Sequence, residues 1–370
     1  MDVRARAPVN LAAVTRNCTR LARQLQGRTR LCVVVKADGY GHGAVECARA
    51  ALEGGASDLA VATADEAIKL RAGAIDAPLL VLGALTLREL AIVIAADAAV
   101  VIWCEEFIAA MRALGRGRVH VKLDTGMGRA GTRDPGTATR IARMVHDAPE
   151  LQLVGAMTHF ATADDRSDSF FGEQLTRFRD WSHRLSREYP QVVAHAANSA
   201  ATLRDRAAHF GMVRCGVAAY GLDPFGESAA AHDLEPALEL QSYLAAVKPC
   251  LAGESAGYGR RFIARSDTTL GILPIGYADG YRRAHTNNAE VLLNGNRYPL
   301  VGSVSMDSIT VDLGSVTDAK VGQTAVLIGR DGKEQITAED LARRLDTINY
   351  EITCGLTSRV PRVYHYDGDQ

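Results

Sequence analysis

The chain is poor in lysine and has neither a cysteine pair nor a long apolar run. Six lysines stand against a combined Lys and Arg count of 42. The seven cysteines are scattered without a Cys-x-x-Cys pair, which argues against a disulfide framework or a zinc site and favours reduced thiols. No stretch is long and apolar enough to span a membrane, and the first residues lack the apolar core of a signal peptide. We therefore expect a cytoplasmic protein without a metal.

The charge balance excludes further classes of partner. A net charge of −1 does not favour nucleic acid or an anionic membrane surface as the main partner. Hydrophobic residues make up 47% and charged residues 23% of the chain, which is ordinary for a globular protein. A length of 370 residues is comfortable for two domains.

The first 220 residues alternate between strand-like and helix-like segments, which predicts an N-terminal (β/α)8 barrel of the TIM type. The helical segment 10–26 precedes the first strand, so we expect the barrel to begin with a helix. The predicted strands are 31–36, 59–62, 79–83, 98–102, 118–124, 153–159, 192–198 and 213–219. The predicted helices are 10–26, 42–54, 64–73, 86–96, 105–115, 135–147, 168–188 and 199–209.

The pattern changes after residue 226, where short β-branched runs alternate with Gly and Pro turns. One helix is expected at 337–346, with Thr337 as its N-cap. We predict an α/β barrel domain over 1–234 and a mainly β domain over 235–370. The predicted strands of the second domain are 268–275, 289–293, 297–302, 308–313, 323–328 and 360–366.

Lys36 is the most informative single residue. It ends the apolar run 31–35 and opens a glycine-rich turn, so it lies where a buried strand meets a loop. Burial lowers the pKa of a lysine, and an uncharged amine can form a Schiff base. The alternative is a strand-end lysine that reaches solvent.

Further polar residues fall at the ends of other predicted strands, where the functional groups of α/β barrels gather. Taken singly, each has a structural explanation: a hydrogen-bonded core histidine, a helix-capping serine or a surface loop arginine. Taken together, at the ends of several strands, they indicate one site. These residues are Lys122, Arg129, His159, Asn198, Ser199 and Arg214.

The sequence Val-Val-Lys-Ala-Asp-Gly-Tyr-Gly-His-Gly at 34–43 closely resembles the pyridoxal-phosphate attachment motif of alanine racemases. Other stretches resemble the same family in order and spacing over nearly the whole chain. They are 122–129, 158–162, 195–199 and 213–221 in the first domain, and 257–259, 274–280, 305–307 and 359–362 in the second. The resemblance implies a barrel followed by a β domain, pyridoxal 5'-phosphate as cofactor, and a homodimer with shared active sites.

The resemblance also implies a two-base mechanism. Lys36 would hold the cofactor and serve as one base, and Tyr258 of the partner subunit would be the base on the opposite face. One base removes the α-proton and the other returns it from the far side, while the cofactor takes up the electrons.

The remaining roles follow from the same resemblance. Tyr40, Ser199, Gly216 and Val217 would bind the cofactor phosphate. Other cofactor contacts would come from His159, Asn198 and Arg214, with Arg214 facing the pyridine nitrogen. Arg129, Tyr277 and Met306 would contact the substrate. Lys122 matches a lysine that is carbamylated in some members of the family.

Three positions depart from the family pattern. Ser358 stands where a tyrosine that reaches the phosphate is common, Ser305 where cysteine is common, and Ser303 where an arginine is common. The resemblance as a whole implies an alanine racemase that supplies D-alanine for peptidoglycan. The alternatives are a broader, serine or lysine racemase of the same fold, a non-enzymatic cofactor carrier, and a fold-related decarboxylase. Tyr258 and Met306 argue against the carrier, and the decarboxylase C-terminal motifs are absent.

Overall fold

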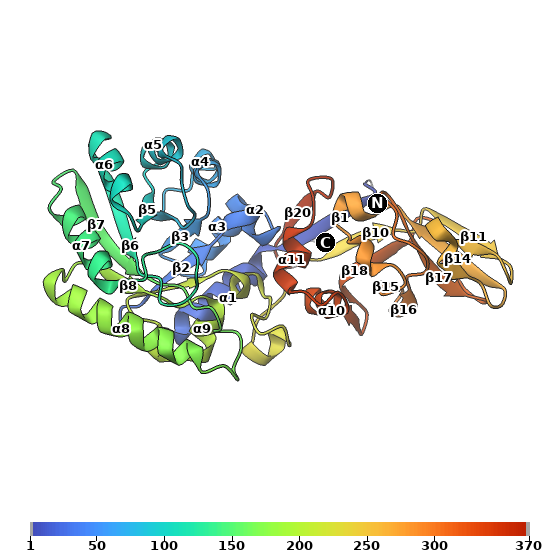
Figure 1. Cartoon of the computed structure of the whole chain (residues 1–370). Helices are drawn as coiled ribbons and strands as arrows, with labels where there is room; N and C mark the ends of the chain where they lie inside the picture. Colours follow the sequence, from blue (N-terminus) through green and yellow to red (C-terminus); the bar gives the residue numbers. More distant parts are fainter. Residues whose placement is uncertain (1–2, 368–370) are drawn as a thin grey trace. The chain divides into compact units, whose positions relative to one another are not determined.

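A computed structural model describes residues 3–367. The chain divides into two compact units (Figure 1). The first comprises residues 14–225 and 229–235, and the second comprises the described residues up to Ala13 together with 226–228 and the chain from Pro236 onward. No helix among the described residues is long and apolar enough to cross a membrane.

Among the described residues, the first unit forms a closed barrel of eight parallel strands, β2 to β9, which confirms the predicted fold. Except for the half-buried β8, every strand is fully or mostly buried, because helices cover the outer face of a parallel barrel. The strands are β2 (Arg30–Val34), β3 (Asp58–Val61), β4 (Leu79–Val81), β5 (Ala99–Ile102), β6 (Gly117–Lys122), β7 (Leu151–Met157), β8 (Val193–His195) and β9 (Met212–Cys215).

Helices connect successive strands of the barrel, as the alternation of the sequence predicts. Thr63 and Thr86 form capping boxes with Glu66 and Glu89 at the starts of two of them. Helix α1 (Leu11–Gln24) precedes the first barrel strand. The connecting helices are α2 (Lys36–Tyr40), α3 (Ala44–Glu53), α4 (Ala64–Ala72), α5 (Leu87–Ala95), α6 (Glu105–Ala113), α7 (Pro135–His146), α8 (Phe170–Glu188) and α9 (Ser199–Arg204).

The second unit is mainly β. Its largest sheet has the order β16-β15-β18-β10-β1-β20, with β19 paired to β18; a second sheet has the order β11-β14-β17, and β12 and β13 form a hairpin. Its strands are β1 (Ala5–Asn10), β10 (Leu240–Tyr243), β11 (Ala246–Cys250), β12 (Ser255–Ala256), β13 (Phe262–Ile263), β14 (Thr268–Leu273), β15 (Glu290–Leu293), β16 (Asn296–Pro299), β17 (Ile309–Gly314), β18 (Thr324–Asp331), β19 (Glu334–Ile336) and β20 (Arg362–His365).

Two helices complete this unit, α10 (Ala338–Arg344) and α11 (Asn349–Cys354). Thr337 caps α10 as predicted, with Asp340 completing its capping box. The predicted barrel domain over 1–234 includes β1, yet β1 pairs with β10 and β20 of the β unit. The barrel itself therefore begins with α1, as the sequence predicts.

Candidate active site

Lys36 lies two residues beyond the end of β2 and is half-buried. The backbone after it is left-handed for five consecutive residues, with φ of 50° at Ala37, 52° at Asp38, 64° at Gly39, 54° at Tyr40 and 84° at Gly41. Three of these residues carry side chains, and each costs about 1–2 kcal/mol in this conformation. Strain of this kind persists where the surroundings hold it in place, and it is concentrated at functional sites.

Neighbouring side chains hold the strained turn. The amide of Ala37 donates to Glu66 Oε1 at 2.6 Å. Asp38 accepts from the amide of Ala44 at 3.1 Å and pairs with Lys69 at 2.6 Å. Helix α4, which carries Glu66 and Lys69, and the start of α3 therefore fix the backbone that follows Lys36.

Arg214 forms the centre of the polar network inside the barrel. Its Nη1 donates to His195 Nδ1 at 2.8 Å and its Nη2 donates to His159 Nδ1 at 3.1 Å. Nη2 also donates to the carbonyls of Thr158 and Ala196. Because a guanidinium has only donors, both imidazoles must accept at Nδ1 and carry their proton on Nε2. Burial, and then the charge of Arg214, hold the pKa of both histidines well below its usual range, so both rings are neutral.

A cluster of cations surrounds this network. Lys122 is the last residue of β6, and burial lowers its pKa to about 8, with further lowering by Arg214 and Arg129 and an opposing effect of Asp124. The charges of Lys36, Lys122, Arg129 and Arg214 all lower the pKa of His159. A site with this excess of positive charge suits an anionic ligand such as a phosphate or a carboxylate.

Asp124 shapes the loop that carries Arg129. Its carboxylate accepts from the amides of Gly126 at 3.1 Å and Gly128 at 3.2 Å. Although burial raises the pKa of Asp124, these hydrogen bonds and that from Arg133 lower it overall. Asp124 is therefore ionised, and its carboxylate is already engaged by amides of its own loop.

A second part of the site lies at the junction of β9 and the turn after β2. Ser199 Oγ accepts from the amides of Gly216 at 3.0 Å and Ala218 at 3.3 Å. A Cβ on Gly216 would lie 2.3 Å from the Tyr40 hydroxyl oxygen, so glycine is required for this close approach. Asn198, not Ser199, is the N-cap of α9, through a 2.9 Å hydrogen bond from the amide of Ala201.

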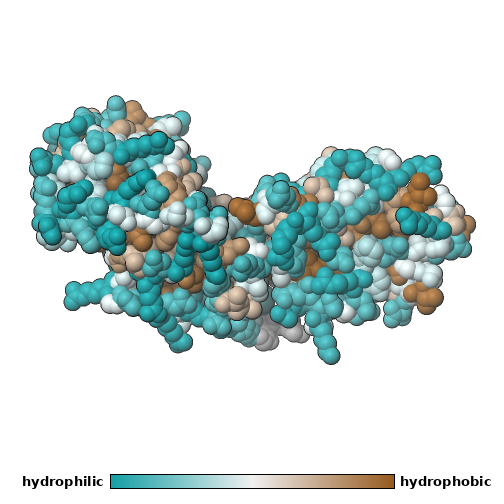
Figure 2. Space-filling view, turned by 60° about the horizontal axis from the view of Figure 1, so that its bottom comes forward, coloured by the Kyte–Doolittle hydropathy of each residue, from teal (hydrophilic) through white to brown (hydrophobic). Residues whose placement is uncertain are grey.

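The residues that the sequence predicts in the second domain, Tyr258, Tyr277 and Met306, lie together on the β unit. Ser303 Oγ donates to the carbonyl of Tyr258 at 2.7 Å, and the amide of Tyr277 donates to the carbonyl of Ser305 at 3.0 Å. The amide of residue 278 donates to the carbonyl of Met306. The segment 303–306 thus holds Tyr258, Tyr277 and Met306 in one region, where they are 74%, 40% and 51% exposed. Exposed apolar residues appear as separate groups in a mainly hydrophilic surface (Figure 2).

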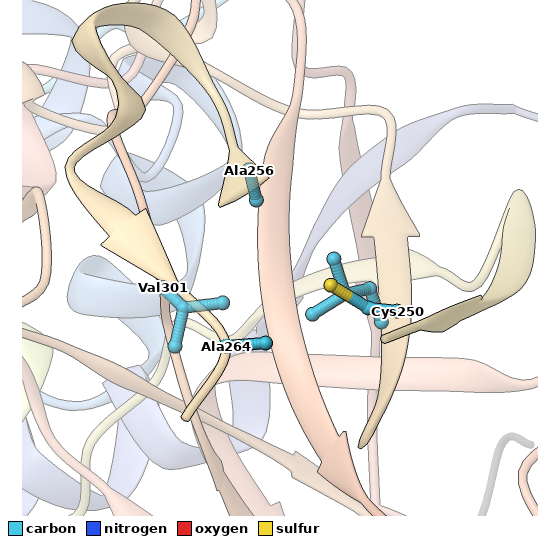
Figure 3. Close-up of a cluster of buried hydrophobic side chains, with 5 residues drawn as sticks. Cys250, Ala256, Ala264 and Val301 are labelled. Carbon is cyan, nitrogen blue, oxygen red and sulfur yellow. The ribbon is translucent and has the colours of Figure 1, made fainter. Parts of the chain in front are cut away.

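A small apolar cluster supports the hairpin that presents Tyr258. Ala256 on β12 and Ala264 just after β13 are buried with Cys250 and Val301 (Figure 3). A Cβ on Gly302 would lie 2.8 Å from the carbonyl oxygen of Ala256, so the two segments are in close contact. The position of Tyr258 is therefore set by packing on both sides of its turn.

The structure thus brings the predicted residues into two groups. Lys36, Lys122, His159 and Arg214 interact within the barrel, and Tyr258, Tyr277 and Met306 lie together on the β unit. Arg129 is exposed on its loop. Ser358 is also exposed. The sequence reasoning gave no role to His120, whose Nδ1 lies 2.8 Å from His195 Nε2.

A closed α/β barrel with a cationic site around a strand-end lysine, followed by a β domain, is typical of barrel enzymes whose active site lies at the C-terminal ends of the strands. The alanine racemase N-terminal domain family matches residues 9–224, and the alanine racemase C-terminal domain family matches residues 237–364. The chain belongs to the alanine racemase family.

Relatives match over nearly their full length. Alanine racemase from Geobacillus stearothermophilus is 41% identical over 97% of this chain and 92% of its own, and alanine racemase 1 from Bacillus subtilis is 38% identical over 98% and 93%. The alanine racemase structure from E. faecalis has a TM-score of 0.93 at 38% identity, covering 98% of this chain and 99% of that chain. The alanine racemase structure from Bacillus anthracis with bound L-Ala-P has a TM-score of 0.91 at 36% identity, covering 99% and 96%.

Proposed function

We propose that this protein is an alanine racemase that interconverts L-alanine and D-alanine with pyridoxal 5'-phosphate, supplying D-alanine for peptidoglycan. The observation that carries the proposal is the strained turn that holds Lys36 beside a buried cationic network, in a chain matched end to end by its family. When bound, the cofactor withdraws electrons from the substrate α-carbon. The protein must supply binding, orientation and two proton-transfer groups.

The barrel residues fit such a cofactor. Its phosphate would lie near Tyr40, Ser199 and the backbone of Gly216 and Val217, where the Tyr40 hydroxyl already approaches Gly216 closely. Asn198 would support this region by capping α9. Arg214 would face the ring nitrogen, and because it does not release its proton, it would leave that nitrogen unprotonated.

Lys36 would attach the cofactor and transfer the α-proton on one face. Tyr258 of a second copy of the chain would transfer it on the other face, and His159 would connect that tyrosine to Arg214. Arg129, Tyr277 and Met306 would contact the substrate. We propose a homodimer because Tyr258, Tyr277 and Met306 are exposed together on the β unit. In this arrangement the region 235–370 completes the site of the partner's barrel region 1–234, and the enzyme acts in the cytoplasm.

Lys122 has the properties of a carbamylation site. A pKa of about 8 leaves a sizeable neutral fraction at physiological pH, and the neutral amine is the form that reacts with carbon dioxide. The reaction of the neutral amine with carbon dioxide forms an N–C bond and releases one proton, which leaves a carbamate anion; starting from the ammonium form, two protons are released in all. That anion would lie within the electrostatic reach of Arg214 and Arg129 and would orient Arg129 toward the substrate.

The test is to incubate the cofactor-loaded protein with single L-amino acids and to quantify both enantiomers by chiral chromatography. We expect fast D-alanine formation and little product from serine or lysine. Comparable product from several amino acids would replace the proposal with a broad-specificity racemase. No D-product from any of them would contradict racemisation.

A further inference from the structure

The barrel contains a cavity at the mouth opposite Lys36. This cavity has a volume of about 270 Å³. The first residues of several strands line it, among them Arg30 of β2, Asp58 of β3, Leu79 of β4, Ala99 of β5 and Met212 of β9. All eight strands are parallel, so the strand starts share one mouth and the proposed catalytic residues lie at the other.

His120 lines this cavity from the middle of β6 and is only 6% exposed. Alternation along the strand places Arg118, His120 and Lys122 on the same face, toward the barrel interior. The pairing register of β6 with β7 shifts at His120, and a Cβ on Gly155 would lie 1.9 Å from the imidazole Nδ1. The bulge and the glycine therefore make room for a histidine where barrels usually place aliphatic side chains.

The network of Arg214 fixes the orientation of the His120 proton. Arg214 donates to His195 Nδ1, so the neutral His195 carries its proton on Nε2 and donates it to His120 Nδ1 at 2.8 Å. Burial lowers the pKa of His120 to about 3, which keeps the ring neutral with its proton on Nε2. Among residues 3–367, His195 is the one hydrogen-bond partner of the His120 side chain. Its Nε2–H is thus a donor left for the cavity.

Two arginines add donors at the rim. Arg30 uses Nη2 to pair with Asp58 at 3.0 Å, and Arg118 uses Nη2 to pair with Asp97 at 2.9 Å. In the described chain their side chains make hydrogen bonds through Nη2 alone, which leaves Nε and Nη1 of each as donors. Asp58 also accepts from the hydroxyl of Ser57 at 2.7 Å, so its carboxylate is already engaged.

Apart from Gln191, the rest of the wall is apolar and includes Leu79, Leu80, Ala99, Val193 and Met212. A cavity with donors at its floor and rim and an apolar wall matches a small ligand with an anionic end and a short alkyl end. Charge-assisted hydrogen bonds would hold the anionic end, and the alkyl end would remove apolar surface from water.

We propose that the N-terminal mouth of the barrel is a second ligand site that binds a small monocarboxylate through the Nε2–H of His120 and the guanidinium of Arg118. An acceptor at this position lengthens the chain His120–His195–Arg214 by one hydrogen bond. Because hydrogen bonds in such a chain polarise one another, occupancy of the mouth is coupled to Arg214 at the catalytic end. The site is distinct from the substrate site proposed above.

A fluorine NMR titration tests the proposal, with 3,3,3-trifluoropropionate as the probe and the cofactor-loaded enzyme as the target. Saturating alanine occupies the catalytic site, so we expect one remaining probe molecule bound per chain. Arg118→Ala should weaken this binding about tenfold, since it removes a charge-assisted donor. Arg116→Ala is the matched control, because Arg116 is an exposed arginine of the same region that does not line the cavity. It should leave binding unchanged.

His120→Phe provides an independent variant that keeps a ring of similar size and removes the donor. We expect this variant to lose the probe molecule that the wild-type enzyme still binds in saturating alanine. Its thermal unfolding should stay cooperative. Complete displacement of the probe by alanine, or equal binding by the Arg118→Ala and Arg116→Ala variants, would overturn the proposal. If alanine displaces no probe at all while Arg118→Ala still weakens binding, the proposed substrate fails and the second site stands.

Discussion

The barrel and the β unit present their proposed catalytic groups in opposite ways. Arg214 is 3% exposed and makes four hydrogen bonds inside the barrel, whereas Tyr258 is 74% exposed and its turn is held through its backbone carbonyl. The barrel groups are therefore preorganised by burial, and their charge states are set by one another. The groups of the β unit are held in place but not enclosed. In the proposed homodimer, the barrel of a second copy would enclose this second set.

Lys36→Ala removes the most critical group of the barrel half and should have the largest effect. We expect complete loss of racemisation and of the visible absorbance of the covalently bound cofactor, because no other side chain takes the place of this amine. Lys248→Ala, at an exposed position on β11, is the matched lysine control and should keep both signals. Absorbance that persists in the Lys36 variant would place the linkage on another residue.

Tyr258→Phe tests the exposed residues of the β unit. In the proposed mechanism the hydroxyl transfers the proton, so turnover should fall roughly 10²–10⁴-fold in both the L-to-D and the D-to-L direction. The covalent cofactor absorbance should stay intact, since Lys36 is unchanged. Steady-state rates in both directions, measured beside the absorbance spectrum, check this. Near-normal rates would remove Tyr258 from the mechanism.

Mixing the inactive Lys36→Ala and Tyr258→Phe chains tests whether the active site combines residues of two subunits. In a mixed dimer, one site combines both lesions and the other has none, so random exchange should restore about a quarter of the wild-type activity. The measurement is the activity of an equimolar mixture after subunit exchange has been demonstrated with labelled chains. If exchange occurs and no activity returns, the site does not draw on two copies.

The same contrast explains what could be predicted from the sequence. The eight barrel strands are visible because each is a local apolar run between helical segments, and all eight are confirmed. Strand β1 was missed because it is short, contains Pro8, and owes its existence to pairing with β10 and β20, which are distant in sequence. The short strands β10 and β11 likewise depend on partners rather than on a strong local pattern.

The details of the site depend still more on tertiary context. Neither Ala37 nor Tyr40 favours a left-handed conformation, so the strained turn after Lys36 could not be read from residue types. His120, in contrast, left a signal. Arg118, His120 and Lys122 alternate with valines at 119 and 121, which places three basic residues on the interior face of one strand.

Ser303→Ala tests the weakest restraint on Tyr258, because a single side-chain hydrogen bond of 2.7 Å holds the Tyr258 carbonyl. Its loss costs about 0.5–1.5 kcal/mol, so we expect turnover to fall by up to about tenfold as Tyr258 becomes less well placed. The cofactor absorbance should not change, because the barrel half is untouched. Ser305→Ala is the matched control, since Ser305 bonds through its backbone in the described chain. Equal rates for the two variants would show that packing against Gly302, and not the Ser303 hydroxyl, positions the tyrosine.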